Sequence, residues 1–143
     1  MVRGKWPKDW LRKFYPGDAS RVRKANAVVH SLQKWQGLRV LKEYGLCLQD
    51  GIVLDENGKP VLHLGSDTCA LCAHYYDSSP DSIGNDSCKT CPLCIARDGI
   101  ACDAVREDEE SSPYWKGVID ENPEAMILWL EKAARLEAER KTK

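Results

Sequence analysis

The sequence predicts an α+β fold in which helices pack on a small antiparallel β-meander that leads into a cysteine-rich segment. Apolar residues recur at helical spacing in the first 45 residues and again after residue 122. Between them lie short β-type runs separated by Asp-Gly and Asn-Gly, and six of the seven cysteines fall within the 34 residues from Cys69 to Cys102. Because a chain of 143 residues can bury one core, we expect a single domain over residues 1–143.

The first part, residues 1–45, is expected to be basic and helical. Pro7 can occupy the first turn of a short helix that ends at Pro16-Gly17, and its shared face holds Trp10, Leu11 and Phe14. A second helix is expected after a cap at Asp18 or Ser20, with a left-handed stop at Gly37. Its core-facing residues would be Val22, Ala25, Val28, Val29, Leu32 and Trp35. We expect His30 to be half-buried with its ring hydrogen-bonded, and two further turns over 38–44 to close at Gly45.

The second part, residues 46–102, combines the predicted meander with the cysteine cluster. Strands are expected over 46–48, 52–54 and 61–64, because Asp50-Gly51 and Asn57-Gly58 supply the positive φ angles of tight hairpin turns. Cys47 would then be a small apolar core residue. A polar surface loop is expected over 77–87, between the cysteine pairs.

The cysteine spacing predicts a zinc site of the zinc knuckle or treble-clef-like kind. Two residues between cysteines allow both thiolates to reach one ion at about 2.3 Å, and two such pairs supply the tetrahedral ligand set of structural zinc. One register uses Cys69, Cys72, Cys88 and Cys91. The other replaces Cys88 by Cys94, because Pro92 can begin a helix that ends at Gly99 and carries Cys94 in its first turn. Cys102 and His74 are alternates, His74 being expected beside the site rather than in it.

Two other uses of the cysteines compete with zinc binding: an iron–sulfur cluster and a disulfide framework. The run Cys88-x2-Cys91-x2-Cys94 matches the opening of an iron–sulfur motif, although the next cysteine follows only at Cys102 and the proline follows the second cysteine. A disulfide framework would leave one of seven cysteines unpaired. Disulfides also fit poorly with the reducing cytoplasm in which we expect the chain, which shows no apolar run of membrane-spanning length and no secretory signal.

Charge is strongly polarised although the net charge is only −1. Residues 1–43 hold 11 Lys and Arg against 3 Asp and Glu, whereas residues 103–124 hold 2 against 8. The basic part allows a nucleic-acid-binding alternative in which phosphates contact Lys5, Lys8, Arg12, Arg21, Arg23 and Lys24. Residues 103–121 are expected to form a solvated acidic loop, which offers a second surface for a protein partner.

A C-terminal helix is expected over residues 122–140. Asn122 and Pro123 are start signals, and the apolar stripe consists of Met126, Trp129, Leu130, Ala133 and Leu136. The stripe is expected to pack into the core, with a homodimer seam as the alternative use.

The usual carriers of catalysis are missing from the sequence. It contains no HExxH, Walker loop, GxGxxG or GxSxG, and no acid-bearing motif of a zinc deaminase precedes its CxxC pairs. A Cys94 and His74 nucleophile pair remains an alternative, but clustered CxxC thiols usually bind metal. We therefore expect a protein that is not an enzyme.

The chain carries, in order, the segment 30–38, Cys-Ala-Leu-Cys, Cys-x-x-Cys-Pro-Leu, Cys102, Ser-Pro-Tyr and Met126-Ile127. In this succession the chain resembles small cysteine-rich, largely uncharacterised proteins of tailed bacteriophages and prophages. The resemblance covers residues 25–135 and includes Cys69, Cys72, Cys88, Cys91 and Cys102 more than Cys94, which favours the Cys88 register. It implies a phage accessory protein in the host cytoplasm. With the zinc site and the polarised charge, the hypothesis is a zinc-stabilised protein that binds, and thereby inhibits or modulates, a host protein. The alternatives are a nucleic-acid-binding zinc protein and an iron–sulfur or redox protein.

Overall fold

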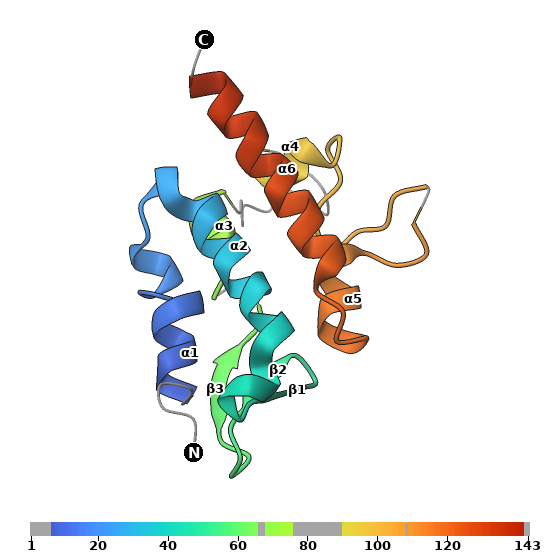
Figure 1. The fold of residues 1–143 in the computed structure, drawn as a ribbon. Helices are drawn as coiled ribbons and strands as arrows, with labels where there is room; N and C mark the ends of the chain where they lie inside the picture. The colour runs from blue at the N-terminus through green and yellow to red at the C-terminus, as the bar shows by residue number, and fades with distance from the viewer. Residues whose placement is uncertain (1–6, 66–67, 76–89, 108, 142–143) are drawn as a thin grey trace, which may run out of the picture.

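The computed structural model describes residues 7–65, 68–75, 90–107 and 109–141. Within these ranges the chain is α+β, as the sequence predicts, with helices packed beside a three-stranded antiparallel sheet (Figure 1). The α-helices are α1 (Pro7–Phe14), α2 (Ala27–Gly37), α3 (Ala70–Tyr75), α4 (Pro92–Ala96), α5 (Pro113–Ile119) and α6 (Glu124–Lys141). Short 3-10 helices are η1 (Ala19–Arg21), η2 (Lys24–Asn26) and η3 (Leu38–Tyr44), and the strands are β1 (Cys47–Gln49), β2 (Ile52–Leu54) and β3 (Pro60–His63).

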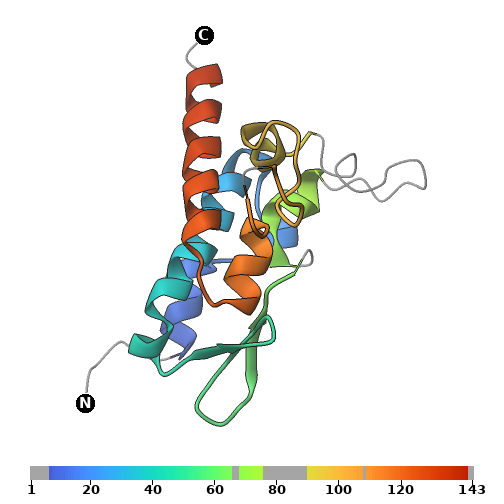
Figure 2. The ribbon, with the colours of Figure 1, turned by 90° about the vertical axis from the view of Figure 1, so that its right-hand side faces the viewer.

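Helix α2 is central to the arrangement. It contacts α1 on one side, α6 on another, and α3 next to the cysteine-rich segment. Figures 1 and 2 show α6 running beside α2, the sheet lying at the end of the molecule near α1, and the C-terminal turns of α6 extending past the other elements. The cysteine-bearing helices α3 and α4 therefore sit on a frame made by α2 and α6, since α4 also packs on α6.

Helix α1 forms where Pro7 and the apolar spacing predict it. Trp10 is fully buried, and its indole Nε1 donates a hydrogen bond to the carbonyl oxygen of Gly37 at 2.8 Å. Gly17, which follows the helix, has a φ of 81°, the left-handed conformation that glycine adopts without strain.

The expected start, end and buried face of the second helix are wrong in part. Residues 19–26 form the two 3-10 helices, so α2 starts only at Ala27, although Asp18 does cap η1 by accepting from the backbone N–H of Ser20. Helix α2 ends at Gly37 as expected, but Gly37 has a right-handed φ of −62° in place of the expected left-handed one, and the chain continues directly into η3. The role of Gly37 is close packing, because a β-carbon there would lie 2.6 Å from Cβ of Phe14.

The buried face of α2 is rotated away from the expected one. Val29 is 51% exposed, whereas Lys34 is only 2% exposed and Ser31 is fully buried beside Val28 and Trp35. A polar strip of α2 therefore faces the interior. That strip contacts the cysteine-rich segment.

The predicted meander is confirmed, with strand order β1-β2-β3. Leu48, Val53 and Leu62 are paired across the three strands, and all three are buried. Asp50 and Gly51 have φ values of 51° and 77°, which is the positive-φ pair of a two-residue hairpin turn. Cys47 was wrongly expected in the core: neighbouring strand residues face opposite sides, so the buried Leu48 turns Cys47 to the surface, where it is exposed.

Helix α5 lies in a described segment after the cysteine cluster where no helix was expected. Residues 103–121, expected as an acidic loop, include α5, which begins at Pro113 after Ser112 caps it by accepting from Trp115 N at 3.3 Å. Helix α6 carries the predicted stripe, and Met126, Leu130 and Ala133 are buried within this one chain, against α2 and α4. The stripe is thus used for core packing.

Candidate metal centre

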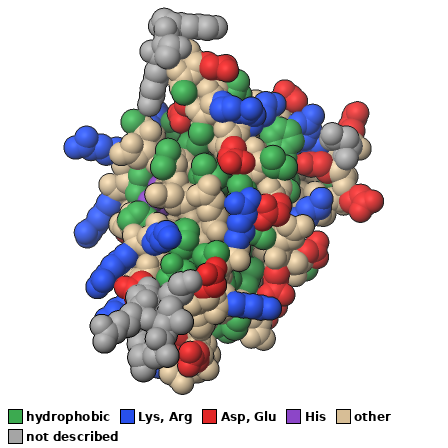
Figure 3. All heavy atoms as spheres, in the orientation of Figure 1, with side chains coloured by type: hydrophobic (Ala, Val, Ile, Leu, Met, Phe, Trp, Pro, Cys, Tyr) green, Lys and Arg blue, Asp and Glu red, His purple; other side chains and the backbone are tan. Residues whose placement is uncertain are grey.

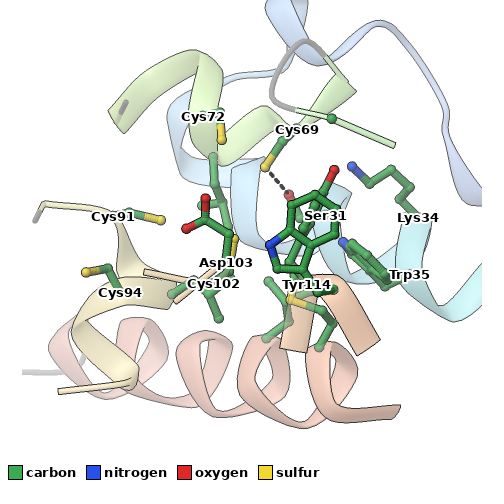
Figure 4. A pocket seen from close by; sticks show the side chains of 16 residues that line it. Ser31, Lys34, Trp35, Cys69, Cys72, Cys91, Cys94, Cys102, Asp103 and Tyr114 are labelled. Atoms are coloured by element: carbon green, nitrogen blue, oxygen red, sulfur yellow. Dashed lines mark hydrogen bonds between the residues drawn. The ribbon is translucent and has the colours of Figure 1, made fainter. Parts of the chain in front are cut away.

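Five cysteines line one cavity of about 370 Å³ between α2, α3, α4 and α5 (Figure 4). They come from three segments of the chain, and the lining cysteines are Cys69, Cys72, Cys91, Cys94 and Cys102. The remaining wall is mainly apolar and includes Trp35, Leu71 and Leu130. The three segments thus bring their sulfurs together in a largely dry part of the interior.

The first pair lies at the beginning of α3 and not on the hairpin turn that a zinc knuckle requires. The carbonyl of Cys69 accepts from the backbone N–H of Ala73 at 3.0 Å, so Cys69 opens the helix and Cys72 follows in its first turn. Residues three apart on a helix share a face, and both side chains point into the cavity (Figure 4). Thr68 ties this start to the end of β3, because its hydroxyl donates to the carbonyl of His63.

The second pair lies at the beginning of α4, where the sequence predicts it. Cys91 occupies the N-cap position, Pro92 is the first helical residue, and Cys94 lies in the first turn. Gly99, with a φ of 90°, follows the helix and donates its N–H to the carbonyl of Cys94 at 2.9 Å. The four cysteines of the treble-clef-like register, two from each pair, thus share the cavity lining.

Cys102 is held at the cavity by α5. Its carbonyl accepts from the backbone N–H of Tyr114 at 3.0 Å, and the Tyr114 hydroxyl donates to the carbonyl of Leu64 at 2.5 Å. Burial raises the pKa of Tyr114, and negative charge on Cys102 and Asp103 raises this pKa further. Tyr114 therefore joins the third cysteine segment to the end of the sheet.

The environments of the thiols differ. The pKa of Cys69 is held well below its ordinary value, mainly because the Cys72 side chain hydrogen-bonds to its sulfur and also through the positive charge of Lys34, while burial opposes this. By contrast, burial raises the pKa of Cys94, which is 1% exposed. Cys69 thus favours the thiolate that binds metal, and Cys94 favours the neutral thiol.

His74, an alternate ligand named from the sequence, is not brought to this cavity. His74 is exposed, and its Nε2 faces the carbonyl oxygen of Val22, so it is neither a ligand here nor a base for Cys94. Cys88 and the expected loop over 77–87 lie outside the described residues. Among the residues that the structure does describe, no three His, Cys, Asp or Glu side chains form a group that could hold a metal ion. The five cavity-lining cysteines thus share one cavity without forming a metal-holding group by themselves.

Two contacts to the cysteine site come from α2, through Ser31 and Lys34, which the sequence pattern did not single out. Ser31 Oγ lies 3.8 Å from Cys69 Sγ, and Lys34 Nζ donates to the carbonyl of Thr68 at 3.0 Å. Because both side chains are polar, the helical pattern of polar and apolar residues predicts that they face solvent.

The basic residues named for nucleic-acid contact are exposed wherever they are described. These are Lys8, Arg12, Arg21, Arg23 and Lys24, whereas Lys5 lies outside the described residues. Figure 3 shows Lys and Arg side chains along the edge occupied by the N-terminal helices, and acidic side chains, mixed with some basic ones, at the opposite edge. A second cavity of about 450 Å³ opens beside Arg21 and Arg23. His30 lines it and is buried, not half-buried as the sequence predicts. Its Nε2 lies 3.0 Å from the carbonyl oxygen of Gly17, and its Nδ1 has no partner among the described residues.

Neither a protein-family model, nor a curated protein, nor a solved structure matches the chain. In the described part of the chain, no helix combines the length and the apolar character needed to cross a membrane.

Proposed function

We propose that this chain is a zinc-stabilised phage accessory protein that acts by binding a host protein. The observation that supports the zinc site is the convergence of thiols from α3, α4 and the segment at Cys102 on one cavity. Sulfur ligands clustered at CxxC spacing in a dry site suit Zn²⁺, which prefers four tetrahedral thiolates. Zinc would then join three short segments that have little regular structure of their own.

The proposed ligands are Cys69, Cys72, Cys88 and Cys91, with Cys102 as the alternate in place of Cys88. Burial raises the pKa of Cys94, which suits a packing residue better than a thiolate ligand. Cys102 is better supported, because it lines the same cavity as Cys69 and Cys72 and its carbonyl accepts a hydrogen bond from the backbone N–H of Tyr114 in α5.

Elemental analysis combined with thiol counting tests the metal. We expect one zinc per chain and four thiols that become reactive only after a chelator removes the metal. The purified protein should be colourless, since an iron–sulfur cluster would absorb visible light. A folded chain without metal, or one carrying iron and sulfide, would contradict the zinc site.

Binding as the mode of action is supported by the polarised charge and by the missing catalytic motifs. A basic edge formed by α1, η1 and η2 can meet an acidic protein surface, and complementary charge speeds and orients association. We propose inhibition or modulation of a host protein as the outcome. This matches the resemblance to phage proteins.

Capture from a nuclease-treated host lysate tests this mode. The wild type should retain a partner in stoichiometric amount, and the triple variant R21E/R23E/K24E should lose it. A matched control is K42E with K116E, which reverses exposed or half-buried lysines away from η1 and η2. Equal capture by both variants would show that the basic edge does not bind the partner. If the wild type retains no partner in stoichiometric amount, the proposal of a host-protein partner is contradicted.

Nucleic-acid binding is the second candidate, favoured by the exposure of five of the six named basic residues. Its affinity should fall steeply with salt, because each neutralised phosphate releases counterions. A gel shift measured from low to physiological salt decides it. Absence of any shift at low salt would remove this candidate without affecting the zinc site.

A further inference from the structure

Lys34 is a buried cation that has no carboxylate partner among the described residues. Its side chain is 2% exposed, and none of the ion pairs in the described part of the chain includes it. Its Nζ donates one hydrogen bond, to the carbonyl of Thr68, and lies 5.8 Å from the ring centre of Trp35. Removing an ammonium group from water is costly unless a negative charge lies nearby. A negative charge near Lys34 would offset this cost.

The candidate source of negative charge is the thiol cavity itself. Lys34 lines this cavity, and the carbonyl that it contacts belongs to the residue directly before Cys69. Ser31, one turn earlier on the same face of α2, lies 3.8 Å from Cys69 Sγ. Figure 4 shows both α2 side chains on the Cys69 side of the cavity. Asp103 also lines the cavity but does not come within 4.0 Å of Lys34 as an ion pair.

We infer that Lys34 is the countercharge of a metal–thiolate cluster and selects an anionic ligand set for this cavity. The inference rests on the proposed zinc site. Four thiolates outweigh the two charges of Zn²⁺, so the cluster is a net anion that a buried ammonium stabilises. Neutral thiols or disulfides would carry no negative charge to offset the positive charge of Lys34. A zinc site in which neutral histidines replace two thiolates would be neutral overall and would also leave that charge without an offset. Lys34 acts through the cluster and is a positioning residue.

Lys132 supplies a matched control. It too donates to a helical carbonyl, that of Ala96 at 2.9 Å, and its Nζ lies 5.1 Å from the ring centre of Trp129. It is half-buried and does not line the cavity. Both lysines thus contact a backbone carbonyl and a tryptophan ring, and only Lys34 lines the cavity of the cysteines.

Chelator competition on the full-length zinc protein measures the effect. Lys34→Gln keeps a donor for Thr68 but removes the charge, Lys34→Arg keeps the charge, and Lys132→Gln is the control. We expect Lys34→Gln to weaken zinc binding about 10- to 100-fold, the usual loss for residues that support metal ligands. Lys34→Arg should stay within about tenfold of the wild type, and Lys132→Gln should leave zinc affinity unchanged.

The outcomes separate the inference from the zinc proposal. A wild type that binds no zinc contradicts the proposed function and, with it, the countercharge. A wild type that binds zinc while Lys34→Gln and Lys132→Gln behave alike overturns only the countercharge. If Lys34→Gln fails to fold in zinc, retained folding and zinc binding in Lys34→Arg supports the charge requirement, and failure of Lys34→Arg as well shows that shape matters instead.

Discussion

Gly117 of α5 packs directly against the indole of Trp35 in α2. A β-carbon at Gly117 would lie 2.2 Å from Cζ3 and 3.0 Å from Cη2 of that ring, and Trp35 is 2% exposed. Because Trp35 also packs edge-on against Tyr114, this contact fixes where α5 meets the cysteine cavity.

We expect Gly117→Ala to lower the free energy of unfolding by about 1–3 kcal/mol, since a buried indole has no room to move away. Chemical denaturation of the metal-loaded protein measures it. Trp35→Phe removes the atoms that the new methyl would meet, so the two changes together should cost less than the sum of the single changes. Simple additivity would show that Gly117 and Trp35 do not meet as described.

The buried ion pair between Arg97 and Glu109 should carry far more stability than the surface pair between Arg39 and Glu124. Arg97 is fully buried, with Nη1 at 2.8 Å from Glu109 Oε2. Glu109→Gln leaves this guanidinium without its counterion and should cost about 3 kcal/mol or more. The matched change Glu124→Gln breaks a pair whose side chains are 44% and 52% exposed and should cost about 1 kcal/mol or less. Equal losses in denaturation experiments would contradict this ranking.

The same pair predicts a loss of stability in acid. Hydrogen bonds from Arg97 hold the pKa of Glu109 below its ordinary value of 4.5. A carboxyl group with a lowered pKa in the folded state stabilises the fold fully above its unfolded pKa, and this contribution disappears as the pH falls through the folded value. The stability difference between wild type and Glu109→Gln should therefore be constant near neutral pH and shrink below about pH 4.5. A difference that stays constant below that pH would contradict the assignment.

Single cysteine variants should separate ligands from packing thiols. Cys69→Ser and Cys72→Ser should abolish stoichiometric zinc, whereas Cys94→Ala should retain it and lose only packing stability. Cys47→Ser is the control, because Cys47 is exposed on β1 and does not line the cavity. Zinc content by elemental analysis is the readout. Loss of zinc in Cys94→Ala would restore the register that uses Cys94.

Comparison of Cys88→Ser with Cys102→Ser decides the fourth ligand. The proposed set loses zinc with Cys88→Ser and retains it with Cys102→Ser. The opposite result would assign the position to Cys102, which α5 holds at the cavity through Tyr114.

Local chemistry made several elements readable from the sequence. Pro7, Pro92 and Asp50-Gly51 constrain the backbone directly, and α1, α4 and the first hairpin form where these residues predict them. Strand alternation would also have placed Cys47 outside, since Leu46 and Leu48 are both buried.

The buried face of α2 and the position of α5 depend on tertiary contacts, which the sequence pattern does not reveal. The buried face of α2 includes Ser31, which contacts the Cys69 sulfur, and Lys34, which donates to the carbonyl before Cys69. Helix α5 was hidden by the acidic run before it, although Ser112-Pro113 is a cap followed by a favourable first residue. The cysteine cluster itself was visible because its spacing is local, but the contribution of α2 to the cavity required the fold.

The close approach of α1 to Gly37 allows the shape of the basic edge to be changed without changing its charge, whereas charge reversal changes both at once. A side chain at Gly37 would collide with Phe14 and Trp10, so Gly37→Ala should loosen the N-terminal helix without altering any charge. The net charge of the molecule would be unchanged while the placement of α1 in its basic edge is altered. A partner that reads shape would then dissociate, and one that merely senses net charge would stay bound.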